Sequence, residues 1–164
     1  MTRRQRNVSF AMAAVVVWML SPKAHAAKAP VADAAMNGDL EVVRSLLAGD
    51  ANVNAAQGDG MTALHWAVYH DDAETAGLLV RSGSDVNAEN RYGVPSLSVA
   101  ATNGSADIVT LLLDAGADAN VTLRGGETVL MTAARTGSLG VVRALLAKGA
   151  DPNAREEREQ TALM

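Results

Sequence analysis

Hydrophobic and polar positions along the chain predict pairs of short helices. The clearest copy predicts one helix over residues 129–136, ended by Gly137, and a second over residues 139–148. The second helix carries four apolar side chains on one face at helical spacing: Val141, Val142, Leu145 and Leu146. Gly149 then stands where a residue without Cβ can adopt the left-handed conformation that ends many helices. The pattern therefore predicts a helix-turn-helix unit.

The unit recurs with a period of 33 residues. The segment "TALHWA" at 62–67 aligns with "PSLSVA" at 95–100, "TVLMTA" at 128–133 and the terminal "TALM" at 161–164. The same step relates two sets of glycines and one set of asparagines: Gly60, Gly93 and Gly126; Gly83, Gly116 and Gly149; Asn54, Asn87, Asn120 and Asn153. One such helix pair cannot bury its apolar face alone, so neighbouring units must stack.

This period, together with "TALHWA", "LLVRSGSDVN" and "LLLDAGADAN", resembles the ankyrin repeat, whose signature is T-P-L-H-x-A. The resemblance extends from about residue 31 to the end of the chain. It implies an all-α ankyrin-repeat solenoid of stacked helix-turn-helix units, with projecting β-turn fingers and a concave groove along the first helices. We expect a domain over residues 27–154, with units at about 28–57, 58–90, 91–123 and 124–156. Residues 157–164 are expected to begin a further, truncated repeat.

The chain departs from the signature at several positions. Only the second unit keeps the motif histidine, His65, whereas Ser98 and Met131 occupy its place in the next two units. The resemblance implies that this histidine braces the turn by hydrogen bonds with the motif threonine, so we expect no brace at Ser98 or Met131. Asp71 replaces the glycine that ends the first helix elsewhere. We expect a positive φ there, at a cost of about 1 kcal/mol, and a locally weaker second unit.

The two ends of the repeat array differ. The first unit has a degenerate turn motif and is predicted to be an N-terminal cap with a polar outer face. At the other end, "EQTALM" begins a unit and stops. We therefore expect Val141, Leu145 and Leu146 to lack a covering neighbour. Either the natural chain continues with at least one more repeat, or the chain frays from Arg155 onward. The first is favoured, because an uncovered apolar face promotes aggregation.

The first 26 residues follow a different pattern. The basic segment "MTRRQRN" precedes an apolar run of 13 residues, 8–20, and the small residues Ala24 and Ala26 follow. This arrangement predicts a secretory signal peptide over residues 1–26, cut after Ala26. The run is shorter than the roughly 20 residues that span a bilayer, although an uncleaved anchor is the alternative. We therefore expect a periplasmic or secreted protein, and favour a bacterial periplasm.

Composition and charge exclude several classes of function. The chain has no cysteine, which excludes disulfides, thiolate nucleophiles and thiolate metal sites. Removing residues 1–26 takes away four of the 14 basic residues and none of the 18 acidic ones, which leaves a formal charge of −8. Such a chain repels nucleic acid and anionic lipid, so neither is expected as a partner. No small-molecule ligand is indicated.

The residues capable of chemistry do not form a recognisable catalytic set. His65 and His70 are five positions apart and do not share a helix face. His65 is predicted to be a hydrogen-bonding motif residue, and His70 with Asp71 and Asp72 a solvated helix end. The segment "RGGET" at 124–128 lacks the Gly-Lys-Ser/Thr ending of a phosphate loop. We therefore expect no catalytic residue, no metal and no cofactor; a small hydrolase or metal-binding protein is the weakest alternative.

Function is instead expected on the variable surface of the stack. The resemblance implies binding through the finger tips and two late positions of each first helix. The predicted partner-binding residues are Tyr69, His70, Asn90, Arg91, Tyr92, Thr102, Asn103, Leu123, Arg124, Arg135 and Thr136. The only two tyrosines of the chain are among them, and tyrosine suits interface hot spots. The three arginines are predicted to form a basic strip able to grip carboxylates of a partner. Trp66 fits either a contact or a packing role.

These observations predict a non-catalytic scaffold, exported to the periplasm, that binds another protein through its concave surface and finger tips. The alternative is the N-terminal ankyrin module of a longer protein whose effector or catalytic domain lies beyond Met164. The identity of the partner is not encoded in any motif of the chain.

Overall fold

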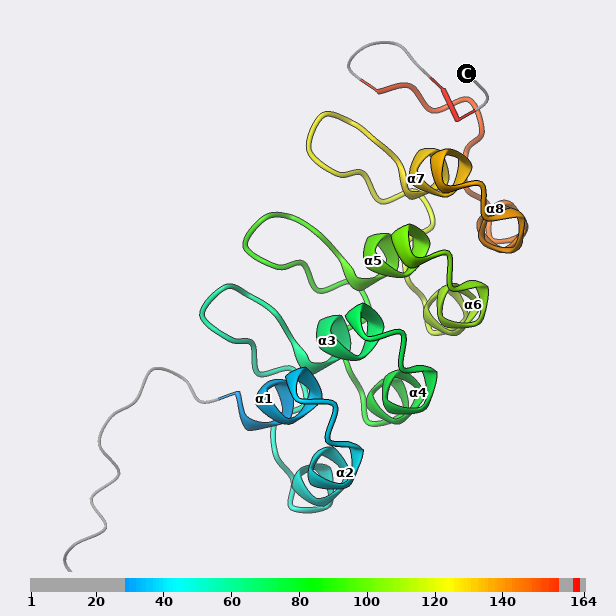
Figure 1. The fold of residues 1–164 in the computed structure, drawn as a ribbon. Helices are drawn as coiled ribbons and strands as arrows, with labels where there is room; N and C mark the ends of the chain where they lie inside the picture. The colour runs from blue at the N-terminus through cyan, green and yellow to red at the C-terminus, as the bar shows by residue number, and fades with distance from the viewer. Residues whose placement is uncertain (1–28, 157–160, 163–164) are drawn as a thin grey trace, which may run out of the picture.

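A computed structural model of the protein describes residues 29–156, 161 and 162, so the predicted signal peptide lies outside the described residues. The described part contains eight helices in four consecutive pairs (Figure 1). They are α1 Pro30–Met36, α2 Leu40–Ala48, α3 Ala63–Tyr69, α4 Ala73–Arg81, α5 Ser96–Asn103, α6 Ala106–Asp114, α7 Val129–Thr136 and α8 Leu139–Ala147. First helices pack on first helices, and second helices on second helices. The predicted all-α repeat solenoid is confirmed. None of these helices has the length and apolar character that a bilayer crossing requires.

Between α2 and α7, three loops project from the stack on the side of the first helices, and we call them fingers (Figure 1). They span residues 57–61, 90–94 and 123–127. In each finger the backbone N–H of the first residue donates to the carbonyl of the last, at 2.9, 3.1 and 2.8 Å respectively. Isolated antiparallel bridges, Glu89 with Pro95 and Thr122 with Thr128, close the base of the second and third fingers. The described residues contain no longer β-structure.

Burial along the second helices follows the 33-residue register. One row of positions at the 33-residue step consists of Val42, Thr75, Ile108 and Val141. All of these side chains are buried except Val42 in the first unit, which is 43% exposed. The row that includes Leu47 and Leu113 ends in Leu146, which is 44% exposed. The first row therefore faces the preceding unit, and the second faces the following one.

The expectation that three apolar residues of α8 lack a neighbour was wrong for two of them. Val141 and Leu145 are fully buried, and only Leu146 is exposed. The reason is their direction: they occupy the places of Ile108 and Leu112, which pack toward the preceding unit. Ala162 also packs against the core.

Aspartates replace glycine at two left-handed positions. Asp71 has a φ of 56°, which confirms the expected positive φ, and its carboxylate accepts a hydrogen bond from the Ser105 hydroxyl. Asp50 has a φ of 57° at the place that Gly83 holds in the next unit. This second exception was not predicted from the sequence. Both positions carry a steric cost that glycine avoids.

Three asparagines at the 33-residue step connect each unit to the next. Each donates its side-chain amide hydrogen to a glycine carbonyl of the following unit at 3.1 Å. Each side-chain oxygen also accepts the backbone N–H of an aspartate two residues further on, at 2.8 to 2.9 Å. The residues are Asn54, Asn87 and Asn120. One amide thus satisfies a backbone donor and a backbone acceptor in loops that have no helical partner.

His65 braces the second finger. It is fully buried, and its Nδ1 lies 2.8 Å from the Thr62 Oγ1 and accepts the Thr62 backbone N–H at 3.3 Å. Its Nε2 therefore carries the hydrogen and donates to the Val94 carbonyl at 3.1 Å. Burial lowers the pKa of His65, outweighing the Val94 carbonyl and the charge of Asp59, which raise it. The ring is thus a neutral link between α3 and the next finger.

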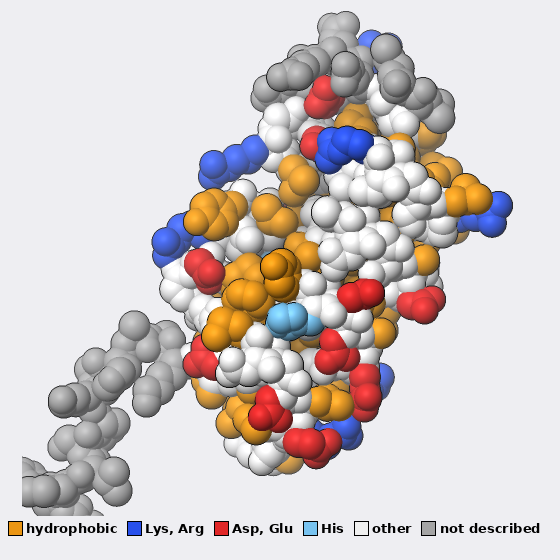
Figure 2. All heavy atoms as spheres, in the orientation of Figure 1, with side chains coloured by type: hydrophobic (Ala, Val, Ile, Leu, Met, Phe, Trp, Pro, Cys, Tyr) orange, Lys and Arg blue, Asp and Glu red, His pale blue; other side chains and the backbone are white. Residues whose placement is uncertain are grey.

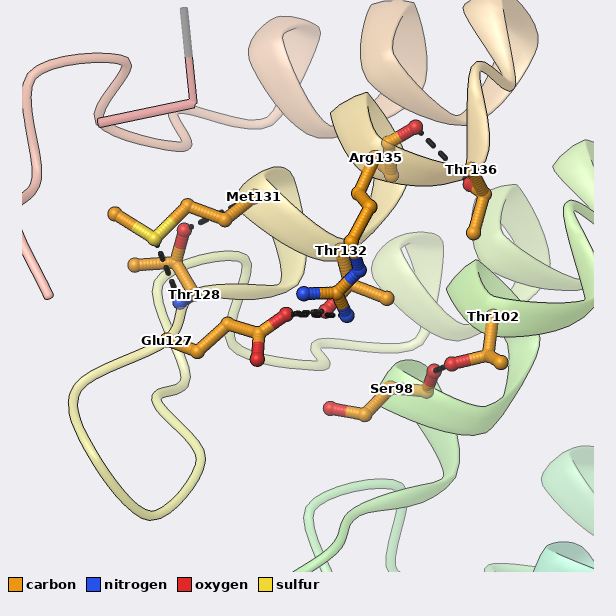
Figure 3. A network of polar contacts seen from close by, with 9 residues as sticks. Ser98, Thr102, Glu127, Thr128, Met131, Thr132, Arg135 and Thr136 are labelled. Carbon is orange, nitrogen blue, oxygen red and sulfur yellow. Dashed lines mark hydrogen bonds and ion pairs between the residues drawn. The ribbon is translucent and has the colours of Figure 1, made fainter. Parts of the chain in front are cut away.

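The other units replace this brace in different ways. At Ser98 it is absent as expected: the Ser98 Oγ is buried with no hydrogen-bond partner, and Pro95 offers no side-chain cap. At Met131 the expectation was wrong in part. The Met131 Sδ accepts the Thr128 N–H at 3.4 Å, and the Thr128 Oγ1 accepts the Met131 N–H at 3.2 Å (Figure 3). Met131 therefore keeps the local contact with Thr128, although a thioether sulfur is only a weak acceptor.

Candidate functional surface

Three ring side chains meet at the C-terminal end of α3, and we call them the aromatic cluster: Trp66, Tyr69 and His70. Trp66 and Tyr69 meet edge to face with centroids 5.8 Å apart, and Tyr69 and His70 do so at 5.5 Å. Trp66 and His70 stack at 6.2 Å with an interplanar angle of 26°. Tyr69 is 61% exposed, so the cluster presents an aromatic side chain to solvent while its own ring contacts restrain it.

Polar contacts fix the cluster against α1 and the first finger. The Trp66 Nε1 donates to the Gln57 Oε1 at 2.8 Å, and the Gln57 Nε2 donates to the Asp33 Oδ1 at 2.6 Å. The His70 Nε2 donates to the Met36 carbonyl at 2.9 Å. Trp66 is partly buried and packs against the core, so it serves both packing and the cluster. The cluster is therefore held in place before any partner arrives.

Two of the predicted contact residues have structural roles. The Asn90 Oδ1 accepts the backbone N–H groups of Tyr92 at 2.9 Å and Val94 at 3.1 Å, which shapes the second finger. The Asn103 Nδ2 donates to the Val68 carbonyl at 2.9 Å and links α5 to α3. These amides position the surface, and their polar atoms are already engaged.

The three predicted arginines differ in their contacts. Arg91 donates through Nη2 to the Gly58 carbonyl of the preceding finger. Arg135 forms an ion pair with Glu127 at 2.7 Å, and Glu127 also accepts the Thr132 hydroxyl at 2.8 Å (Figure 3). Arg124 is exposed and has no hydrogen-bond or ion-pair partner within the described part of the chain. Of the predicted basic strip, only Arg124 is thus fully available to an anionic group.

The remaining predicted residues lie at the helix ends and in the second and third fingers. The Thr102 hydroxyl donates to the Ser98 carbonyl at 2.8 Å, and the Thr136 hydroxyl donates to the Ala133 carbonyl at 3.0 Å. Leu123 is partly buried in the third finger, and Tyr92 is 62% exposed in the second. We call the surface formed by the fingers and the last residues of α1, α3, α5 and α7 the finger face.

The carboxylates that could take part in catalysis or metal binding each form hydrogen bonds with a different partner. Asp71 accepts from Ser105, whereas Asp72 caps α4 by accepting the Thr75 backbone N–H at 3.0 Å. Burial raises the pKa of Asp72, but hydrogen bonds from Thr75 and the Glu74 backbone, with the charge of His70, outweigh burial and lower it. Among residues 29–156, 161 and 162, no three metal-ligating side chains come together. A depression of about 230 Å³ between the starts of α4 and α6 is lined by Asp71, Ser105 and Asp107, and no histidine or lysine lies among its lining residues.

One link of this surface was not predicted from the sequence. Gln57 lies in the first finger, and its hydrogen bonds with Trp66 and Asp33 join residues of three different elements. The 33-residue register shows which residues share a position but not which rotamers meet. The sequence signal for this contact was a glutamine at the base of a finger, followed by a tryptophan in the next helix.

Comparison with known proteins agrees with the repeat architecture. A family model described as "Ankyrin repeats (3 copies)" matches residues 9–90, 31–123 and 97–164. The search of the curated proteins gave no match. The matched segments together extend over more than half of the chain and include all four helix pairs. The chain therefore belongs to the ankyrin-repeat family.

Proposed function

We propose that this protein is a non-catalytic scaffold that binds a partner protein through the finger face. Ankyrin repeats are generally protein–protein interaction modules, and the family is typically non-catalytic. The observation that carries the proposal is the aromatic cluster: Tyr69 is 61% exposed on a helix end whose neighbouring rings are fixed. Large aromatic side chains at rigid positions supply much of the affinity in protein interfaces.

The energetics favour recognition by a rigid surface. Residues of the cluster are held by the hydrogen bonds of Trp66 and His70, so binding does not have to order them. Truncating a hot-spot tyrosine costs about 2 kcal/mol, which corresponds to roughly 30-fold in the dissociation constant. Tyr69 and Tyr92 are the residues whose removal is expected to have such an effect.

We further propose that the protein works in the periplasm. The proposal is supported by the basic and apolar pattern of residues 1–20, followed by the small residues Ala24 and Ala26 at the third and first positions before the expected cut. The intact mass of the protein recovered from a periplasmic fraction tests it. The expected mass is that of a chain that begins at Ala27. Recovery of the protein in the membrane fraction with residues 1–26 still attached would exclude cleaved export.

A pull-down from periplasmic extract tests the binding proposal. Residues 27–164 serve as bait beside a variant carrying Tyr69→Ala, Arg91→Ala and Tyr92→Ala. A control variant carries Arg44→Ala and Glu74→Ala, which remove an exposed ion pair between the second helices α2 and α4. Circular dichroism first establishes that all three fold.

The proposal predicts that a protein is retained by the unmodified bait and the control and is lost with the triple variant. Equal retention by all three baits would exclude the finger face as the binding surface. If none of the baits retains a protein, the proposed binding activity of residues 27–164 is wrong.

A further inference from the structure

Charge is distributed unevenly along the stack. Residues 29–90, which form the first two helix pairs, contain ten aspartates or glutamates against two arginines, a formal charge of −8. Residues 91–156 contain six acidic and six basic residues, a formal charge of 0. The aromatic cluster therefore lies in the acidic half. On the face shown in Figure 2, acidic side chains surround the hydrophobic group beside the histidine, and basic ones lie farther along the fingers.

A carboxylate is linked to the aromatic cluster. Gln57 bridges the indole N–H of Trp66 to the Asp33 carboxylate, at 2.8 and 2.6 Å. Asp33 is exposed and its carboxylate accepts this one hydrogen bond within the described part of the chain, so most of the acceptor capacity of the carboxylate remains. The exposed Tyr69 ring stands in the same cluster. A ring face within about 6 Å and a nearby carboxylate are the two features that stabilise a bound ammonium or guanidinium group.

An anionic ligand fits this half of the surface poorly. Ten carboxylates repel it, and the basic residues of the finger face are partly engaged: Arg135 pairs with Glu127 at 2.7 Å, and Arg91 donates to the Gly58 carbonyl. A cationic group gains both the local contacts and the attraction of the acidic half. The sign of the field thus selects between the two kinds of ligand.

We propose that the aromatic cluster and Asp33 receive a lysine or arginine side chain from a basic segment of the partner protein. This rests on the proposed function, and it defines the chemistry of the partner at one position. Tyr69 and Trp66 supply the aromatic contact and Asp33 supplies the charge. The acidic first half of the stack attracts the segment before it docks.

Trp66 reports on this site directly. It is the sole tryptophan of the chain that begins at Ala27, because the other one is Trp18. Its fluorescence is therefore measured while residues 27–164 are titrated with short peptides of alanine, serine and leucine. The peptides carry arginine, glutamine or glutamate at the same positions. We expect the arginine peptide to bind at least tenfold more tightly than the glutamine peptide, and the glutamate peptide to leave the emission unchanged.

Matched variants separate the site from general attraction. Tyr69→Ala and Tyr92→Ala remove tyrosines of nearly equal exposure, 61% and 62%, without changing the charge. Tyr69→Ala is expected to weaken the arginine peptide about tenfold and Tyr92→Ala less than threefold. Asp33→Asn and Glu74→Gln each remove one negative charge. Only Asp33→Asn is expected to weaken binding more than threefold.

Several results would overturn this inference: equal binding of the arginine and glutamate peptides, equal effects of the two tyrosine variants, or no change of emission with any peptide. The proposed function fails by a different result, which is retention of the same proteins in the pull-down by the bait and the triple variant. A partner lost with the triple variant together with a silent arginine peptide would keep the scaffold and reject the cationic site.

Discussion

Ser98 offers a test of how the missing histidine brace affects stability. Its hydroxyl is buried in α5, where the second unit has His65, and it has no hydrogen-bond partner. A buried polar group without a partner loses its hydration and gains nothing in return. Replacing the hydroxyl by hydrogen in Ser98→Ala removes that penalty and keeps the backbone of α5 unchanged. The variant is therefore expected to be more stable than the natural protein.

The size of the effect follows from three contributions. An unsatisfied buried hydroxyl costs about 1–3 kcal/mol. Alanine also favours a helix over serine by about 0.5 kcal/mol. The small space left by the oxygen offsets part of this gain, about 0.5–1 kcal/mol. We therefore expect the free energy of unfolding to rise by about 1–2 kcal/mol. In a domain of this size that raises Tm by about 4–8 °C.

Thermal unfolding followed by circular dichroism measures the change, with Thr132→Val as the matched control. The Thr132 hydroxyl is also buried, but it donates to Glu127 at 2.8 Å. Losing this satisfied bond is expected to lower Tm. A lower Tm for Ser98→Ala would refute the reasoning, because it would mean that the Ser98 hydroxyl contributes favourably to the fold.

Three further predictions concern the stack. Asp50→Gly removes a side chain from a φ of 57° and is expected to stabilise by about 1 kcal/mol in urea unfolding. Asp71→Gly is expected to gain less, because it also loses the bond from Ser105. Since burial lowers the pKa of His65 from its ordinary 6.5, the unfolded chain takes up a proton that the folded protein does not as pH falls below 6.5. The urea midpoint should therefore fall between pH 6.5 and 5 and depend less on pH in His65→Gln. Asn87→Ala loses two bonds to the next unit and should destabilise by about 2–3 kcal/mol, whereas an unchanged midpoint would contradict the asparagine link.

Local features of the sequence predicted the helices closely. Residues 129–136 form α7 with the expected bounds, and the second helix of that unit ends at Ala147, one residue before the predicted end. Threonine caps and left-handed glycines act within a few residues, so their effect is legible without a structure. The burial of Val141 and Leu145 could not be predicted in this way, because it depends on the direction in which the units stack.

The binding surface was predictable only in outline. The register placed Tyr69 and His70 at a helix end, but the bridge from Asp33 through Gln57 to Trp66 depends on rotamers in three elements. The pairing of Arg135 with Glu127 likewise requires the third finger to fold back toward α7. The first contact places a carboxylate beside the aromatic cluster, and the second neutralises an arginine, so the register alone did not show which charge the surface presents.

Hydrogen–deuterium exchange of the chain with its captured partner distinguishes binding at the finger face from binding elsewhere on the stack. If the finger face binds, backbone amides of residues 57–70 and 90–94 should exchange more slowly in the complex, while those of α2 and α4 keep their rates. Protection confined to α2, α4, α6 and α8, with unchanged exchange in the fingers, would contradict the account.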